Sequence, residues 1–144
     1  RYSRVTGVQT CALPILVDFL ILNRDRHGAN IEVLRNSKEK TLRLAPVFDH
    51  GLSLLFSCQT EKAVDEFDVM QDRPIQCFVG GNSAQKNLEL IPKKELPQFH
   101  PLKEEHRNEL LGGLEGIVPQ YLLNKIWDMI WNRWLYYEDF CNQK

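Results

Sequence analysis

Three polar residues, Asp25, Asn30 and Asp49, have the types and spacing that a metal-assisted reaction needs. Asp25 and Asn30 lie five residues apart in the polar segment 23–30, and Asp49 follows a later apolar segment. A carboxylate and an amide oxygen are hard ligands that suit Mg²⁺. We therefore expect Asn30 and Asp49 to be metal ligands, and Asp25 to be a carboxylate that accepts a proton.

Phosphoryl transfer is a reaction that uses such a set, because it depends mainly on positioning and charge neutralisation. In the protein-kinase pattern H-R-D-x-x-x-x-N, the aspartate orients the attacking hydroxyl and the asparagine holds a metal. A second aspartate, that of D-F-G, holds metal against the phosphates. Here Asn23-Arg24-Asp25 stands in place of H-R-D, Asn30 has the required offset, and Asp49-His50-Gly51 stands in place of D-F-G.

A β-hairpin is the element that must bring these residues together. Residues 31–34 and 41–44 are short strand-like segments, and the polar residues 36–40 form the turn between them. Pro46 should end the strand pairing. Because a hairpin brings its two ends together, we expect Asn30 and Asp49 to be neighbours.

The remaining segments indicate a mainly helical chain. Residues 16–22 are apolar except for Asp18, which fits either a buried strand or the end of a helix. A short helix can begin after Thr60, residues 72–74 and 80–83 mark turns, and three prolines make 92–101 resemble a linker. Residues 103–111 predict a helix that ends near Gly112, and Pro119 is a plausible first residue of another. The apolar face of that last helix, which we interpret as core and not as a ligand-stacking surface, contains Leu123, Ile126, Trp127, Ile130, Trp134 and Tyr137.

The N-terminal sequence VTGVQTCALPI, residues 5–15, resembles a translated sequencing adapter. We therefore expect residues 1–15 to be a non-native segment and residues 16–144 to be the protein proper. The adapter also explains why the start imitates a signal peptide. Omitting residues 1–15 removes two arginines and no acidic residue, so the formal net charge changes from −1 to −3.

Composition narrows the function classes. The chain has 144 residues, of which 43% are hydrophobic, enough for a core. Its 18 basic and 19 acidic residues nearly cancel, so we expect no direct nucleic-acid binding. The cysteines form no CxxC pair, which argues against zinc and disulfide frameworks, and Cys58, Cys77 and Cys141 are expected to be thiols in a cytoplasmic protein. No segment predicts a membrane span.

The sequence LILNRDRHGANIEVL, followed by LAPVFDHGLSLL, resembles the start of the C-terminal lobe of HipA-like serine/threonine kinases, over residues 16–56. The resemblance implies an α+β, mostly α, kinase lobe whose small hairpin carries the catalytic and metal loops. It implies ATP and Mg²⁺ as cofactors, Asp25 as the catalytic residue, and Asn30 and Asp49 as the Mg²⁺ ligands. It further implies a bacterial enzyme that phosphorylates serine or threonine of a protein substrate, often itself, and that often works beside a DNA-binding antitoxin-like partner.

Three neighbouring residues, Arg24, Arg26 and His27, have two interpretations each. His27 occupies the place where many protein kinases carry a lysine near the transferred phosphate, so it either assists catalysis there or braces the hairpin. Arg24 and Arg26 either contact phosphate or pair with nearby carboxylates. His50 replaces the phenylalanine of D-F-G, which puts an activity switch based on packing that ring in doubt. The Gly80-Gly81-Asn82-Ser83 segment lacks phosphate-loop spacing, and we interpret it as a turn.

Three other functions fit parts of the pattern. A phosphoinositide-type kinase also has D-R-H-x-x-N and a later D-x-G, and a non-catalytic kinase relative could be a scaffold for an antitoxin-like partner. A metal hydrolase could use Asp25, His27, Asp49 and His50, although their spacing matches no known ligand motif.

A kinase also needs a glycine-rich loop and a lysine-bearing strand before the catalytic loop. Only residues 16–24 precede that loop here, so we expect this chain, as a fragment, to bind ATP weakly and to transfer phosphate negligibly.

Overall fold

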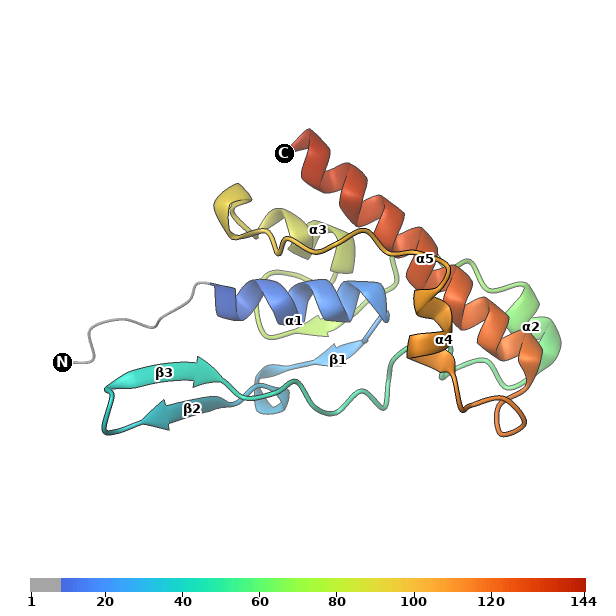
Figure 1. Ribbon diagram of the computed structural model, residues 1–144, viewed down its shortest axis with the longest axis horizontal. Coiled ribbons are helices and arrows are strands. Elements are labelled where there is room, and N and C mark those ends of the chain that lie inside the picture. The colour runs from blue at the N-terminus through green and yellow to red at the C-terminus, as the bar shows by residue number, and fades with distance from the viewer. Residues whose placement is uncertain (1–8) are drawn as a thin grey trace. The chain divides into compact units, whose positions relative to one another are not determined.

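The computed structural model describes residues 9–144 and shows a mixed α/β chain in which helix predominates (Figure 1). This agrees with the expected α+β, mostly α, class. The expected boundary between residues 15 and 16 falls inside the first helix, and residues 1–8 lie outside the described part. In chain order the elements are α1 (Gln9–Leu20), β1 (Asp25–Arg26), the 3-10 helix η1 (Gly28–Asn30), β2 (Val33–Asn36), β3 (Thr41–Leu44), α2 (Glu61–Asp65), β4 (Gln76–Cys77), α3 (Ala84–Glu89), the 3-10 helix η2 (Lys93–Glu95), α4 (His106–Leu111) and α5 (Gln120–Gln143).

The chain divides into two compact units. Unit 1 contains the described residues up to Ser53 together with Asp72–Pro97. Unit 2 contains Leu54–Gln71 and Gln98–Lys144. One boundary falls within the proline-containing segment that the sequence marks as linker-like. All of the candidate site residues belong to unit 1.

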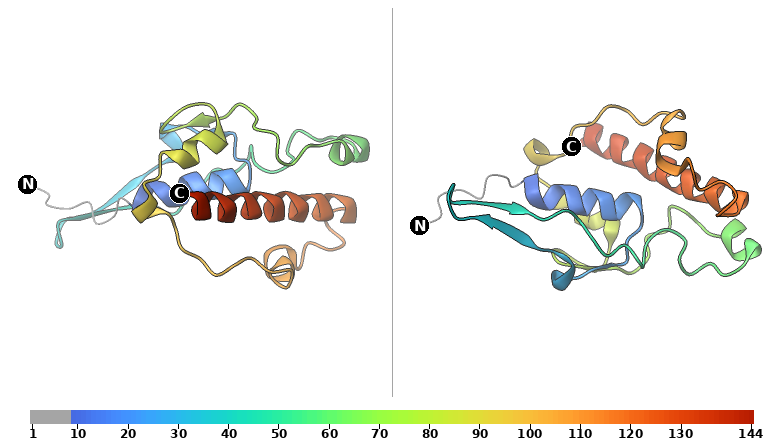
Figure 2. Two further views of the ribbon diagram at one scale, coloured as in Figure 1. Left: turned by 90° about the horizontal axis from the view of Figure 1, so that it is seen from above. Right: turned by 60° about the horizontal axis from the view of Figure 1, so that its bottom comes forward.

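Unit 1 is built on α1, which packs against α3 (Figure 2). Phe19 of α1 and Leu88 of α3 are fully buried. The apolar segment 16–22 is thus the end of a helix, one of the two structures that its sequence allowed. The helix stops because Leu22 adopts φ +50°, so that its amide donates to Phe19 O (3.3 Å) and the Asn23 amide donates to Asp18 O (2.9 Å). This pattern is a Schellman C-cap, formed here on leucine where glycine is usual.

A short parallel pairing and a separate hairpin complete unit 1. Strand β1 pairs with β4, with Asp25 opposite Gln76 and Arg26 opposite Cys77. The hairpin β2–β3 is antiparallel, with Val33 opposite Leu44, which confirms the predicted hairpin. The first strand is shifted along the chain relative to the prediction. It begins at Val33 and not at Ile31, and it includes Asn36, which pairs with Thr41 and was expected in the turn.

Polar side chains close the turns of unit 1. Ser83 caps α3 by accepting a hydrogen bond from the Lys86 amide (3.1 Å). The buried Asn87 side chain holds both backbone groups of Gly81, accepting from its amide (2.9 Å) and donating to its carbonyl (3.0 Å). Residues 80–83 are therefore a turn, as expected, and Gly80 has a φ of +78° that favours glycine.

Unit 2 is built on α5, against which α2 packs. Thr60 caps α2 by accepting from the Ala63 amide (3.1 Å), which confirms the predicted short helix. Helix α4 begins at His106, three residues later than expected, and ends at Leu111 as expected. Pro119 precedes α5 as its cap residue and is not its first helical residue, since its ψ of 139° is extended.

The predicted apolar face of α5 is buried, apart from the half-buried Ile130. The interpretation of this face as core holds for Trp127 and Trp134, which are buried. The neighbouring Trp131 is half-buried, and its ring centroid lies 5.6 Å from that of Trp127. Arg133 is fully buried on the same helix and donates through Nε to Val69 O (2.7 Å). No helix among residues 9–144 combines the length and apolar character that a membrane span requires.

Candidate active site

Asp25 lies in β1, where backbone hydrogen bonds fix the chain on both sides. Its amide donates to Asn23 Oδ1 (3.1 Å), and Gln76 N donates to Arg24 O (2.9 Å). Asn23 is itself held by a bond from its Nδ2 to Asp18 Oδ1 (3.0 Å). The Asp25 side chain is 31% exposed, so its carboxylate is accessible to a substrate although its backbone is fixed.

Asn30 is buried at the end of η1 and is tied directly to Asp25. Its Nδ2 donates to Asp25 O (2.9 Å), and its backbone amide donates to His27 O (2.9 Å). The bond through Nδ2 fixes the orientation of the side-chain amide and leaves Oδ1, the atom that could bind a metal, at the other end. The sequence spacing D-x-x-x-x-N is therefore realised as a closed loop.

His27 caps η1 and lies beside Asp25. Its Nδ1 accepts from the Ala29 amide (3.2 Å), and its Nε2 lies 3.6 Å from Asp25 Oδ1. A neutral imidazole that accepts at Nδ1 carries its proton on Nε2. This geometry suits the bracing interpretation of His27 and also directs a donor toward the candidate catalytic carboxylate.

Asp49 is exposed and has a left-handed backbone, with φ +55°. Aspartate adopts this conformation more readily than most residues do. The conformation still costs energy, and it is found mainly at turns and functional sites. The chain after Asp49 is anchored, because Ser53 N donates to His50 O (3.1 Å) and Arg24 N donates to Leu52 O (3.0 Å). The second of these bonds ties the Asp49 segment to the Asp25 segment.

Arg26 is the residue that joins the two ends of the hairpin. It is only 1% exposed and pairs with Asp18, with Nη2 2.9 Å from Oδ1 and Nε 2.9 Å from Oδ2. Its Nη1 donates both to Asn30 O (3.1 Å) and to Phe48 O, the carbonyl immediately before Asp49. Of the two interpretations of Arg26, the structure therefore shows pairing with a carboxylate. The Asn30 and Asp49 segments meet at one guanidinium nitrogen.

Asp18 and Asn23 support the site through hydrogen bonds, a role that the sequence did not reveal for either residue. The available signal was Asp18, an acidic residue within an apolar segment. It is buried on α1 and contacts both Asn23 and Arg26. Arg24 donates through Nε to Pro74 O (3.2 Å), a backbone contact that the sequence did not suggest.

The expected metal ligands form a minimal donor set. Among residues 9–144, no three or more His, Cys, Asp or Glu side chains are grouped to hold a metal ion. Asn30 and Asp49 would supply one amide and one carboxylate oxygen. Mg²⁺ in phosphoryl-transfer sites typically takes one or two carboxylates and completes its octahedron with water and phosphate oxygens, so this donor chemistry fits Mg²⁺.

Cys77 lies in β4, the strand that pairs with β1, and the pKa of its thiol is shifted. Burial raises the pKa of its thiol, and the Asp18 carboxylate adds to the rise. Cys77 is opposite Arg26 in the β1–β4 register. The three described cysteines, Cys58, Cys77 and Cys141, are free thiols, as expected.

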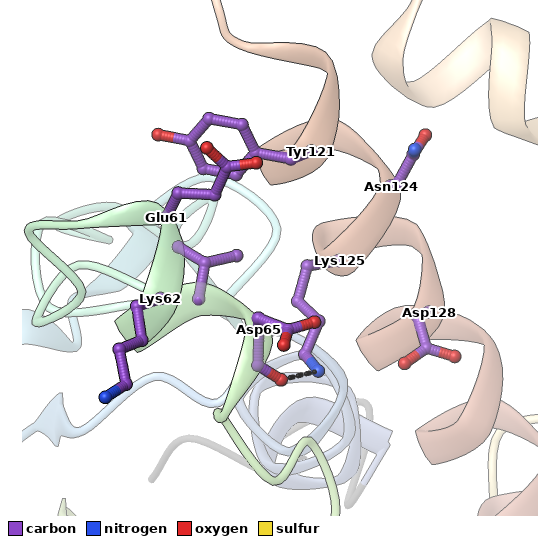
Figure 3. Close-up of a pocket in the computed structure, with 8 residues that line it drawn as sticks. Glu61, Lys62, Asp65, Tyr121, Asn124, Lys125 and Asp128 are labelled. Atoms are coloured by element: carbon purple, nitrogen blue, oxygen red, sulfur yellow. Dashed lines mark hydrogen bonds between the residues drawn. The ribbon is translucent and has the colours of Figure 1, made fainter.

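A separate cavity of about 710 Å³ lies between α2 and α5, within unit 2 (Figure 3). Its charged lining has both signs, and Lys125 Nζ donates to Asp65 O (2.9 Å). None of the candidate site residues lines it. The cavity is lined by Glu61, Lys62, Val64, Asp65, Tyr121, Asn124, Lys125 and Asp128.

Comparisons of the chain with models of protein families, with curated proteins and with solved structures gave no match.

Proposed function

We propose that the chain carries the catalytic and metal loops of a HipA-like serine/threonine protein kinase, which transfers the γ-phosphate of ATP in the presence of Mg²⁺. The observation that supports this proposal is the closed arrangement of Asp25, Asn30 and Asp49. These residues keep the kinase order and flank a hairpin, and Arg26 joins the two flanks. The DNA-binding antitoxin-like partner remains a prediction from the resemblance, and the cytoplasmic location remains a prediction from the cysteine pattern.

In this proposal each residue has a defined task. Asp25 accepts a hydrogen bond from the attacking hydroxyl and takes its proton as transfer proceeds. His27 orients the Asp25 carboxylate through Nε2. Asn30 and Asp49 would hold Mg²⁺, which neutralises charge on the transferring phosphoryl group when bound.

Transfer of labelled phosphate from [γ-³²P]ATP tests the proposal. The protein assayed is the one encoded by the uninterrupted reading frame that contains residues 16–144. Asp25→Asn and Asp49→Ala should each abolish labelling of a serine- or threonine-containing protein. Glu39→Gln, which removes an exposed carboxylate from the hairpin turn, should retain it. If both site variants transferred phosphate as well as the parent chain, the proposal would be wrong.

The same assay separates the alternatives. Phosphoinositide vesicles offered in parallel would become labelled if the enzyme were a lipid kinase. A non-catalytic scaffold would label neither protein nor lipid. Transfer to protein that requires Asp25 and Asp49 is the result that the proposal predicts.

A further inference from the structure

Arg26 uses every donor that a guanidinium possesses. An arginine side chain has five N–H groups in a rigid planar arrangement. Nε donates to Asp18, Nη2 donates to Asp18 and contacts His50 Nδ1 (3.1 Å), and Nη1 donates to Asn30 O and Phe48 O. Because arginine has no acceptor, the His50 contact requires Nδ1 of the imidazole to accept.

The positions of these acceptors are more informative than their number. Asp18 lies on α1, and Asn30 ends η1, two residues short of the hairpin strand β2. Phe48 and His50 are the residues immediately before and after Asp49. A single side chain therefore connects a helix of unit 1 with both flanks of the hairpin.

Asp49 depends on this connection more than Asn30 does. The Asp49 side chain is exposed and its φ is +55°, so packing of its own side chain does not fix its direction. The backbone carbonyl on one side of it and the imidazole on the other are instead held by two nitrogens of Arg26. Asp49 is thus the tip of a loop held at both ends.

We infer that Arg26 is a positioning residue, which sets the separation between Asn30 and Asp49 and so creates the metal site. This inference rests on the proposed function where it concerns the metal. Lysine cannot replace Arg26 in this role, because one ammonium nitrogen cannot reach acceptors on several sides. Residues that orient metal ligands in this way typically change metal affinity by about 10- to 100-fold when they are replaced.

The primary test is Mn²⁺ binding by the 144-residue chain, followed by paramagnetic broadening of its backbone amide signals. In the unaltered chain, we expect Mn²⁺ to broaden the Asn30 and Asp49 signals selectively. In Arg26→Lys, the affinity should fall by about 10- to 100-fold. As Mn²⁺ is added, the broadening of the Asn30 signal should no longer keep a constant ratio to the broadening of the Asp49 signal. The reason is that the segments containing Asn30 and Asp49 would then move independently.

Arg133→Lys is the matched control, because Arg133 is also a fully buried arginine that donates to backbone carbonyls, but in unit 2. It should lower stability and leave Mn²⁺ affinity unchanged. If Arg26→Lys is folded and binds Mn²⁺ like the unaltered chain, the inference is overturned while the proposed function stands.

Two further measurements keep the inference testable. If Arg26→Lys does not fold, the double variant Asp18→Leu/Arg26→Met replaces the buried ion pair with apolar side chains, a change that proteins often tolerate. It should show the same loss of Mn²⁺ affinity, and an unchanged affinity would overturn the inference.

If the unaltered chain does not bind Mn²⁺ at Asn30 and Asp49, the metal part of the inference is overturned, while the phosphate-transfer assay still decides the proposed function. Amide hydrogen exchange then tests whether Arg26 fixes the two segments. The Asn30 and Ser53 amides, which bond to His27 O and His50 O, should then exchange faster together in the variant. Unchanged exchange at both would overturn the inference.

Discussion

Replacing Asn87 with alanine should loosen the strand that pairs with the catalytic loop. The Asn87 side chain makes two hydrogen bonds to the Gly81 backbone, of 2.9 and 3.0 Å. The adjacent Asn82 carbonyl accepts from Ile75 N (3.0 Å), directly before β4. A hydrogen bond contributes about 0.5–1.5 kcal/mol net, so losing both should cost about 1–3 kcal/mol. The upper part of that range requires that water does not replace the lost bonds.

The readout must report unit 1, because all three tryptophans lie in unit 2 and fluorescence would follow unit 2 only. The Gln76 amide, which bonds to Arg24 O (2.9 Å), is suitable for hydrogen exchange. A loss of 1–3 kcal/mol corresponds to exchange about 5- to 150-fold faster. Guanidinium denaturation followed by circular dichroism gives an independent value of the lost stability.

Two further variants separate the hydrogen bonds from the filled space. Asn87→Asp has the same size but faces the Gly81 carbonyl with an oxygen in place of a donor, so it should be at least as damaging as Asn87→Ala at pH 7. Lys86→Ala, an exposed change on the same helix, should alter stability by less than about 0.5 kcal/mol. If Gln76 exchanged equally fast in Asn87→Ala and in the unaltered chain, the assignment of this clamp would be wrong.

Three other substitutions test single features of the fold. Burial and a hydrogen bond with Cys141 raise the pKa of Tyr137, so the native state holds the phenolic proton more tightly than the unfolded state. The free energy of unfolding should therefore fall as pH rises above about 10. Tyr137→Phe should remove part of that fall, which thermal denaturation at several pH values would measure. Ser53 Oγ is buried with no hydrogen-bond partner among the described residues. Ser53→Ala should therefore raise the free energy of unfolding by about 1 kcal/mol in chemical denaturation. A fall in that free energy by a similar amount would show that the hydroxyl does have a partner. Thr60→Ala removes the cap of α2 and should cost about 1 kcal/mol, which guanidinium titration followed by tryptophan fluorescence would detect; a variant as stable as the parent would show that the cap contributes nothing.

The sequence predicted those elements that form through interactions between residues close together in the chain. The hairpin β2–β3 joins segments separated by a short polar turn, so its pairing is encoded within neighbouring residues. The buried face of α5 follows from side-chain spacing over a long helix. Thr60, followed by an acidic first turn, marked the start of α2.

The missed elements depend on distant partners. Strands β1 and β4 have two residues each, which is too short for an alternating pattern, and they pair across about fifty residues of sequence. Helix α3 is also short, and its cap residue Ser83 belongs to a segment whose sequence indicates only a turn. In the candidate site, the order of Asp25, Asn30 and Asp49 was readable from sequence. Sequence alone could not decide between the two environments of Arg26, because its main partner, Asp18, lies on a helix eight residues earlier.

The pairing of Arg26 with Asp18 has a consequence for ionic strength. The two side chains carry opposite formal charges and are nearly inaccessible to solvent, so the interior of the site is electrically neutral and shielded from mobile ions. Any charge that an approaching anion meets must come from the exposed groups around it. Added salt should therefore weaken the attraction of a charged ligand to this loop while leaving the loop's own architecture in place.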